Sequence, residues 1–144
     1  MKNKTLATWL TLLLGPLGMH RFYLYGWRNT LGWLTIVPTA LGLYGLQRVQ
    51  DYGLDDTVSW VLLPIFGIHL AAICLNAIVY GLMTPEKWNA QFNPEVEPEG
   101  IPGQTRWATI GAIVISLMIG TVLLLSALAY AFQRYFEYAS APLN

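Results

Sequence analysis

The sequence alternates between long apolar stretches and short charged segments. Four stretches contain no Asp, Glu, Lys or Arg: Thr5–His20 with 16 residues, Asn29–Gln47 with 19, Thr57–Pro85 with 29 and Trp107–Gln133 with 27. A helix rises about 1.5 Å per residue and the hydrocarbon core of a bilayer is about 30 Å thick, so about 20 residues cross it. The pattern therefore predicts an all-α, polytopic membrane protein with four transmembrane helices.

The third and fourth stretches are long enough to cross the hydrocarbon core with some tilt. We expect spans at Val58–Met83 and Trp107–Phe132, each of 26 residues. Asp55 and Asp56 precede the third span, where carboxylates suit a helix N-terminus. With Asp51 they form an acidic cluster, which we interpret as a solvated loop with a helix cap.

The first two stretches are shorter, and two interpretations remain open. Thr5–His20 measures about 24 Å as a helix, and Pro38 and three glycines interrupt Asn29–Gln47. The pair forms either two short spanning helices or a hairpin that dips part-way into the bilayer. Both interpretations return the chain to the side on which it began. The eight Lys and Arg residues then divide equally between the two sides, which leaves the orientation open.

This pattern divides the chain into four parts. They are a two-helix hairpin at 1–56, a third span at 57–83, an interfacial helix with a linker at 84–106, and a fourth span with a short tail at 107–144. Thr84-Pro85-Glu86 favours a helix start. The prolines and glutamates of Asn93–Gly103 predict an extended, solvated linker.

Composition and charge exclude several classes of protein function. The chain is 55% hydrophobic and 11% charged, whereas soluble domains are roughly 45–50% apolar and about 25% charged. A net charge of zero supplies no basic face, which argues against nucleic-acid binding. The single cysteine, Cys74, excludes an internal disulfide. Lys2 and Lys4 precede an apolar run without a cleavage site after it, so we expect an uncleaved first helix.

The segment Gly15–Gly26 is the part of the chain that composition explains least. Arginine at mid-bilayer costs about 2.5–3.5 kcal/mol, so Arg21 belongs at an interface. We expect a short turn between two helices, in which His20 and Arg21 either bond helix-end carbonyls or bind an anionic lipid headgroup or an acidic residue of a partner. This candidate interaction turn comprises Gly15, Gly18, His20, Arg21, Phe22, Tyr23 and Gly26.

The motif G-x-x-G-x-H-R-F-Y-L, between two short apolar segments, resembles the TM-two family of two-transmembrane-helix domains. The resemblance covers residues 2–56. It includes the basic start at Lys4-Thr5-Leu6-Ala7, and Asp51 is the nearest match to an Asp that commonly follows the second helix. Tyr25 stands before Gly26, whereas a glycine usually follows F-Y-L directly in the family. The later segments look like a bacterial subgroup with two additional helices. The resemblance implies a bacterial inner membrane and no agreed biochemical activity.

The third span carries a candidate intramembrane polar face, because His69, Asn76 and Tyr80 recur at helical spacing. Such groups are functional candidates in a membrane. They are also ordinary interhelical hydrogen-bond partners, worth about 0.6 kcal/mol each. On the fourth span, small residues recur every four positions and allow close packing, either within the chain or between two copies. This helix-packing stripe comprises Ala108, Ala112, Ser116 and Gly120.

No nucleophile–base pair, zinc-protease motif or phosphate-binding glycine loop is present in the sequence. We therefore expect no enzymatic activity, no cofactor and no bound metal. The expected function is that of an accessory protein that binds partners or lipids through the His20–Gly26 turn and its helix faces. Its partners would be the lipid bilayer and either another membrane protein or a second copy through the fourth helix. The alternative is a small transporter or channel subunit that uses the polar face of the third span.

Overall fold

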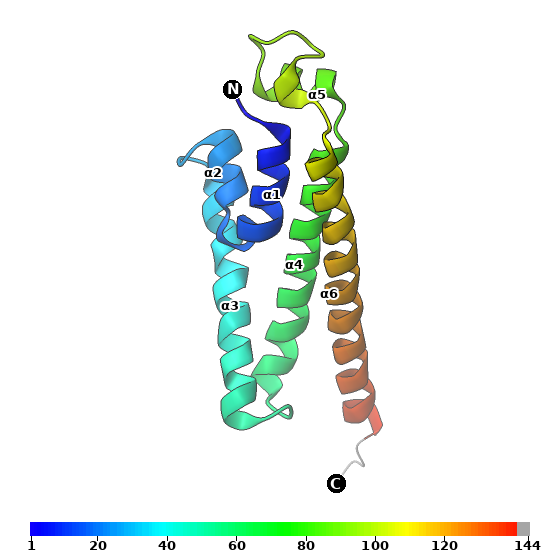
Figure 1. Ribbon diagram of the computed structural model, residues 1–144. Helices are drawn as coiled ribbons and strands as arrows, with labels where there is room; N and C mark the ends of the chain where they lie inside the picture. The colour runs from blue at the N-terminus through cyan, green and yellow to red at the C-terminus, as the bar shows by residue number, and fades with distance from the viewer. Residues whose placement is uncertain (141–144) are drawn as a thin grey trace.

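A computed structural model describes residues 1–140 (Figure 1), so the last four residues of the expected tail, 141–144, lie outside the described residues. Within this range every regular element is a helix and no strand occurs. The long elements are α-helices, and η1 and η2 are single turns of 3-10 helix. The elements are α1 (Lys4–Leu14), η1 (Gly15–Leu17), α2 (Met19–Tyr25), α3 (Thr30–Tyr52), α4 (Thr57–Leu82), α5 (Pro85–Phe92), η2 (Ile101–Gly103) and α6 (Trp107–Ser140).

Three long helices, α3, α4 and α6, run side by side along the length of the molecule (Figure 1). The short helices α1 and α2 pair beside one half of this bundle, and α5 with η2 covers the same end. We refer to this end, which holds Met1, α5 and the α2–α3 turn, as the N-terminal end. The C-terminal end holds the α3–α4 turn and the end of α6.

Two helices are long and apolar enough to cross a membrane: α4 at Thr57–Leu82, and α6 together with η2 at Ile101–Ser140. The expected spans Val58–Met83 and Trp107–Phe132 coincide with them, and α6 continues beyond Phe132 to Ser140. The structure does not confirm four spans. The 23-residue α3 is long enough, but its glycines and polar residues lower its hydropathy.

The first helix ends early because of its local sequence. Pro16 has no amide hydrogen with which to continue α1, and Gly18 takes a left-handed φ of 72°, which glycine adopts without strain. The chain reverses there, and Met19–Tyr25 forms the helix α2 where we expected only a turn. The hairpin thus closes before α3 begins, and α3 carries Arg48 to the C-terminal end, far from Lys2 (Figure 1). The structure therefore places Lys2 and Arg48 at opposite ends of the bundle, whereas both interpretations of the first two stretches expected them on one side.

Side-chain caps set where four of the helices begin. The side-chain oxygens of Asn3, Asn29, Asp56 and Thr84 each accept a hydrogen bond from a backbone N–H in the first turn of α1, α3, α4 and α5. Each bond satisfies one of the amides that a helix start leaves without a partner. The cap at Asp56 agrees with the role expected for the acidic cluster.

Helices α4 and α6 pack closely along their whole length because small residues line their seam. A Cβ atom added to Gly67 would lie 2.7 Å from the Ala127 Cβ, and one added to Gly120 would lie 2.8 Å from the Cys74 Cβ. Near the N-terminal end, a Cβ on Gly81 would lie 2.6 Å from Ile113. These contacts hold the two most apolar helices together as one antiparallel pair.

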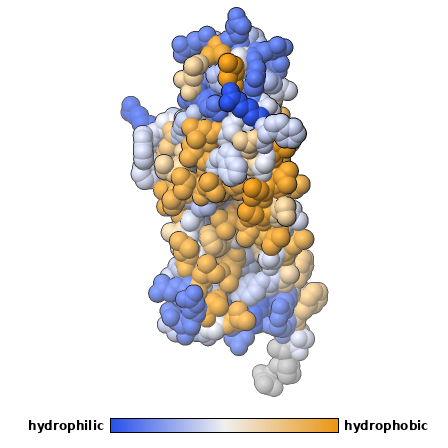
Figure 2. All heavy atoms as spheres, in the orientation of Figure 1, coloured by the Kyte–Doolittle hydropathy of each residue, from blue (hydrophilic) through white to orange (hydrophobic). Residues whose placement is uncertain are grey.

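On the face of the bundle that Figure 2 shows, the surface is mostly apolar in its middle and hydrophilic at its two ends. On α6 alone, Leu117, Met118, Val122 and Leu125 are each about 60% exposed. Large apolar side chains that point outward from a helix pair are suited to hydrocarbon and costly in water.

Candidate functional site

The glycines of the candidate interaction turn fit the hairpin against two other helices. A Cβ on Gly18 would overlap the backbone oxygen of Gly32 at the start of α3, and a Cβ on Gly15 would overlap Ile73 of α4. Gly26 ends α2 with a φ of 84° and open space around it. Gly15 and Gly18 are therefore needed for close packing, whereas Gly26 is needed for the backbone turn.

The aromatic and histidine residues of the turn face inward. His20 is 1% exposed and Phe22 is 7% exposed. The Phe22 ring packs over Gly32 and stacks on Trp27 at a centroid distance of 4.9 Å. The Tyr23 hydroxyl accepts a hydrogen bond of 2.9 Å from the Asn3 backbone N–H. These side chains hold the hairpin in place, so they are not available to a partner.

The structure brings the turn and the polar face of α4 together. The His20 and Tyr80 rings lie 6.2 Å apart. The Thr39 hydroxyl of α3 lies 3.2 Å from His69 Nε2 and donates a bond of 2.8 Å to the Pro16 carbonyl. Residues of the turn and of α3 thus meet polar residues of α4 at two separate places, at Tyr80 and at His69.

The buried His20 side chain lacks a polar partner within the described residues. Neither ring nitrogen of His20 has a hydrogen-bond partner among residues 1–140. Asn76 is half-buried on α4. A buried imidazole without a partner is rare, because its polar atoms lose their bonds to water without replacement.

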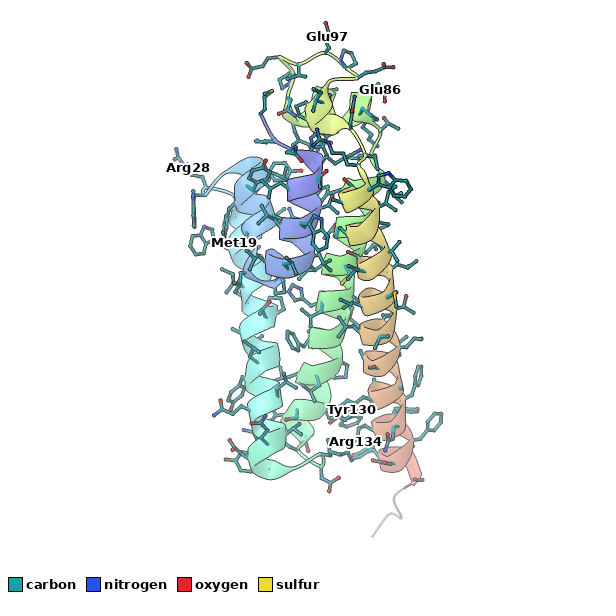
Figure 3. All side chains as sticks on the ribbon, viewed as in Figure 1. Met19, Arg28, Glu86, Glu97, Tyr130 and Arg134 are labelled. Carbon is teal, nitrogen blue, oxygen red and sulfur yellow. The ribbon has the colours of Figure 1, made fainter. Side chains whose placement is uncertain are left out.

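The surface that the hairpin presents outward consists of other residues. Tyr25 is 46% exposed and Trp27 is 65% exposed, and Arg28 projects from the α2–α3 turn (Figure 3). Arg21 is half-buried one turn below. Trp33 of α3, also exposed, donates from its indole to the Trp27 carbonyl at 3.0 Å. We name Tyr25, Trp27, Arg28 and Trp33 the α2–α3 patch. It combines aromatic rings with a cation, as residues at a membrane interface do.

Sequence reasoning missed a buried lysine at the N-terminal end. The Lys4 side chain is fully buried, and its ammonium donates to the Met83 carbonyl and to Thr105 Oγ1, both at 2.7 Å. Met83 follows the end of α4, where a cation compensates the partial negative charge of the helix. Lys4 thereby joins α1, α4 and the segment before α6. The sequence shows Lys4 at the start of the chain, but it does not indicate that Lys4 bonds to the Met83 carbonyl 79 residues later.

The segment expected to be an extended linker is instead folded onto α5. Asn89 is fully buried, and its side-chain nitrogen donates to the carbonyls of Glu97, Pro98 and Gly100 at 3.0–3.2 Å. Trp88 is also fully buried, and its indole donates to the Lys2 carbonyl at 2.8 Å. The prolines and glutamates thus form an ordered loop, because one amide side chain replaces the backbone partners that the loop lacks.

The C-terminal end is held by ion pairs. Arg48 makes a bidentate contact with Asp56, at 2.9 and 2.6 Å, and Asp56 also accepts from Ser59. These hydrogen bonds, with that from Arg48 the strongest, hold the pKa of the Asp56 carboxyl well below its usual range. Arg134 pairs with Asp55 at 2.9 Å and with Glu137 at 2.8 Å (Figure 3).

The helix-packing stripe lies mostly against α4. Ala112 and Ser116 are fully buried, and Gly120 approaches Cys74 closely. Ala108 is exposed, and Thr109 takes the buried position in its place. The Ala108 carbonyl accepts a hydrogen bond of 3.0 Å from the Trp9 indole, so the stripe also contacts α1.

No known relative identifies the chain. No protein-family model, no curated protein sequence and no solved structure matches it. Within the described residues, no three His, Cys, Asp or Glu side chains converge to hold a metal ion. The resemblance of Gly15–Gly26 to the TM-two family stays a prediction from these residues.

Proposed function

We propose that the chain is a multi-pass integral membrane protein that crosses the bilayer three times, through α3, α4 and α6. The 23 residues of α3 measure about 34 Å, which matches a hydrocarbon core of about 30 Å. The 11 residues of α1 measure about 16 Å, which is only half of it. The α1–α2 hairpin would then enter from one side to half depth. The apolar middle of the surface supports this placement (Figure 2).

A three-span arrangement also favours one orientation. Only Arg48 and Arg134 belong to the C-terminal end, and the other six Lys and Arg residues lie on the hairpin or at the N-terminal end. Cytoplasmic loops are enriched in Lys and Arg. We therefore propose a cytoplasmic N-terminal end and an external C-terminal end, in a bacterial inner membrane as the resemblance implies. The uneven distribution of Lys and Arg between the two ends follows from the hairpin, because α1 and α2 pair at the N-terminal end and α3 then carries Arg48 to the opposite end from Lys2.

The proposed function is that of a non-enzymatic accessory protein that binds anionic groups at the cytoplasmic surface through the α2–α3 patch. The exposed Trp27 and Arg28 carry this proposal, since Phe22 and Trp33 hold them on a rigid support. Anionic headgroups of the cytoplasmic leaflet attract basic side chains by about 1 kcal/mol each. The same patch suits an acidic segment of a partner membrane protein.

The topology can be tested with single cysteines in a Cys74→Ala background, because Cys74 is the only cysteine. Asp51→Cys marks the C-terminal end and Glu97→Cys marks the N-terminal end. A thiol reagent that cannot cross membranes should label Asp51→Cys in intact cells, and Glu97→Cys only after lysis. Labelling of both positions in intact cells would refute the three-span arrangement.

Headgroup binding can be tested by measuring the lipid that stays with the purified protein. After reconstitution in equal phosphatidylethanolamine and phosphatidylglycerol, the variant Arg28→Gln should retain less phosphatidylglycerol than the unaltered protein. Lys87→Gln, at an exposed position on α5, is the control, because it also removes one positive charge. Equal retention in all three proteins would contradict headgroup binding, and a partner protein lost only from Arg28→Gln would favour the partner.

A transporter or channel subunit is the second candidate. The unpartnered His20 ring beside Tyr80, together with the His69–Thr39 contact, places polar groups between the helices, which favours this function. Ion flux into proteoliposomes that disappears in His69→Ala and in His20→Leu would support this function. The absence of flux in the unaltered protein would exclude it.

A further inference from the structure

A small hollow lies at the C-terminal end, away from the hairpin and the α2–α3 patch. It has a volume of about 210 Å³ and forms where the start of α4 meets the end of α6. Its walls combine two aromatic rings, two carboxylates and one guanidinium. They are Asp55, Thr57, Trp60, Arg134, Glu137 and Tyr138.

The chemistry of this hollow suits an ammonium group. The Trp60 and Tyr138 rings lie 6.0 Å apart at an angle of 36°, and aromatic faces attract cations. Asp55 and Glu137 both pair with the single Arg134, which leaves one net negative charge. The Asp55 side chain is 96% exposed, so a ligand can reach it from the surface.

An apolar groove runs along the same face of the α4–α6 pair. Its volume is about 320 Å³, and Ile68, Ala72 and Leu75 line it from α4. Trp60, Ala71 and Ile78 recur at helical spacing on α4, as do Tyr138, Leu124 and Leu117 on α6. The hollow and the groove therefore lie in line, with a polar opening at the end of the helices and an apolar channel further in.

The distances allow the acyl chain of one phospholipid to reach the nearer part of the groove. The groove begins at Ile68 and ends at Ile78, which places it about 12 to 27 Å along α4 from Trp60. A headgroup layer of about 6 Å and a half-core of about 15 Å bring the end of an acyl chain to about 21 Å. An ammonium beside Trp60 would thus place the second half of an acyl chain in the groove.

We propose that the α4–α6 seam binds one zwitterionic phospholipid of the leaflet at the C-terminal end. Its ammonium lies between Trp60, Tyr138 and the two carboxylates, and one acyl chain occupies the groove. The charge of the hollow selects against anionic lipids, because its two carboxylates, Asp55 and Glu137, outnumber its single guanidinium, Arg134. This inference rests on the membrane placement proposed above, but it does not use the α2–α3 patch.

The test uses the full chain in vesicles of equal phosphatidylethanolamine and phosphatidylglycerol. The lipids that stay with the protein after mild detergent extraction are measured by mass spectrometry. The variants are compared in an Arg28→Gln background, so that phosphatidylglycerol held by the α2–α3 patch does not mask the result. We expect the ratio of phosphatidylethanolamine to phosphatidylglycerol in the retained lipid to exceed the vesicle ratio about two- to tenfold. Trp60→Leu and Glu137→Gln should each reduce this enrichment at least about twofold. Asp51→Asn, which removes one negative charge from the same end outside the hollow, should leave it unchanged.

Ala72→Phe tests the groove separately, because Ala72 is exposed and a larger side chain there fills the channel without entering the protein interior. It should reduce enrichment as strongly as Trp60→Leu does. Enrichment that survives Ala72→Phe, or that Asp51→Asn lowers as much as Glu137→Gln, would overturn the proposal. Protein that leaves the membrane fraction without detergent would instead overturn the membrane placement, so the two failures can be told apart.

Discussion

Replacing Asn89 with aspartate should release the loop at the N-terminal end while leaving the helices in place. The Asn89 amide has two N–H donors, which three backbone carbonyls of residues 97–100 share at 3.0–3.2 Å. A carboxylate has the same shape but no donor, and it faces those carbonyls with a buried negative charge. Loss of two hydrogen bonds at roughly 0.5–1.5 kcal/mol each weakens the loop by about 1–3 kcal/mol. That corresponds to a roughly 5- to 150-fold increase in local opening.

Hydrogen exchange of the loop amides measures this opening directly. The backbone N–H groups of Val96, Gly100 and Gly103 are hydrogen-bonded within the loop, so they should exchange faster by that factor. Gln91→Glu is the control, because it makes the same amide-to-carboxylate change at an exposed position of α5. If Asn89→Asp and Gln91→Glu gave the same exchange rates, the loop would not depend on Asn89.

Three further predictions concern stability in detergent. Gly18→Ala should destabilise the protein by more than the roughly 1–2 kcal/mol of left-handed strain, because its Cβ also overlaps Gly32. Gly53 has a φ of 83° and a ψ of −178° with open space around it, so Gly53→Ala should cost about 1–3 kcal/mol of backbone strain without any overlap. Thermal unfolding should therefore show the larger loss for Gly18→Ala. Trp88→Ala should lower the free energy of unfolding by about 3–5 kcal/mol, and Trp88→Phe by about 1 kcal/mol. If chemical unfolding showed a similar decrease for both variants, packing of the Trp88 ring would be unimportant. Because the folded pKa of Asp56 is depressed, its ion pair contributes stability above the unfolded pKa of about 3.9 and loses it as pH falls towards the folded pKa. The melting temperatures of the unaltered protein and of Asp56→Asn should therefore differ by a constant amount from pH 7 to about 4.5, and by less below about pH 4. A difference in melting temperature that vanished by pH 6 would contradict the stabilising role of this ion pair.

The apolar pattern was sufficient to place the two most apolar helices. The expected spans 58–83 and 107–132 lie on α4 and α6, because hydrocarbon-length runs without charge leave few alternatives to a helix. The sequence also predicted the capping role of Asp56, since a cap bonds to a backbone N–H within three residues along the chain. Local interactions of this kind need no knowledge of the rest of the fold.

The hairpin was harder to predict, although Gly15 and Gly18 belong to the expected turn. The sequence predicts a turn at these residues, but it does not predict how far along the bundle the hairpin extends. That depth follows from Gly18 meeting Gly32 and from Gly15 meeting Ile73, contacts that join positions on different helices. As a result, the side on which Arg48 lies could not be read from the pattern of charges.

In the candidate site, too, the sequence did not predict which side chains are buried by contacts between distant residues. His20 and Phe22 were selected for chemistry or contact with a partner, but they are buried against Tyr80 and Trp27. Lys4 and Asn89 were not selected, because their partners are backbone carbonyls, and a sequence does not indicate which carbonyls remain free.

By itself, the sequence determined that this chain is helical, that α4 and α6 are apolar along the length of a bilayer, and that its charges lie outside these runs. Hydropathy and capping settle those properties within a few turns of helix. Only the tertiary structure decided that the first hairpin stops half-way along the bundle, that six of the eight basic residues lie on the hairpin or at the N-terminal end, and that Trp60 meets Tyr138. Each of these depends on close packing between residues far apart in the chain, where the fit of a glycine or a ring decides the arrangement.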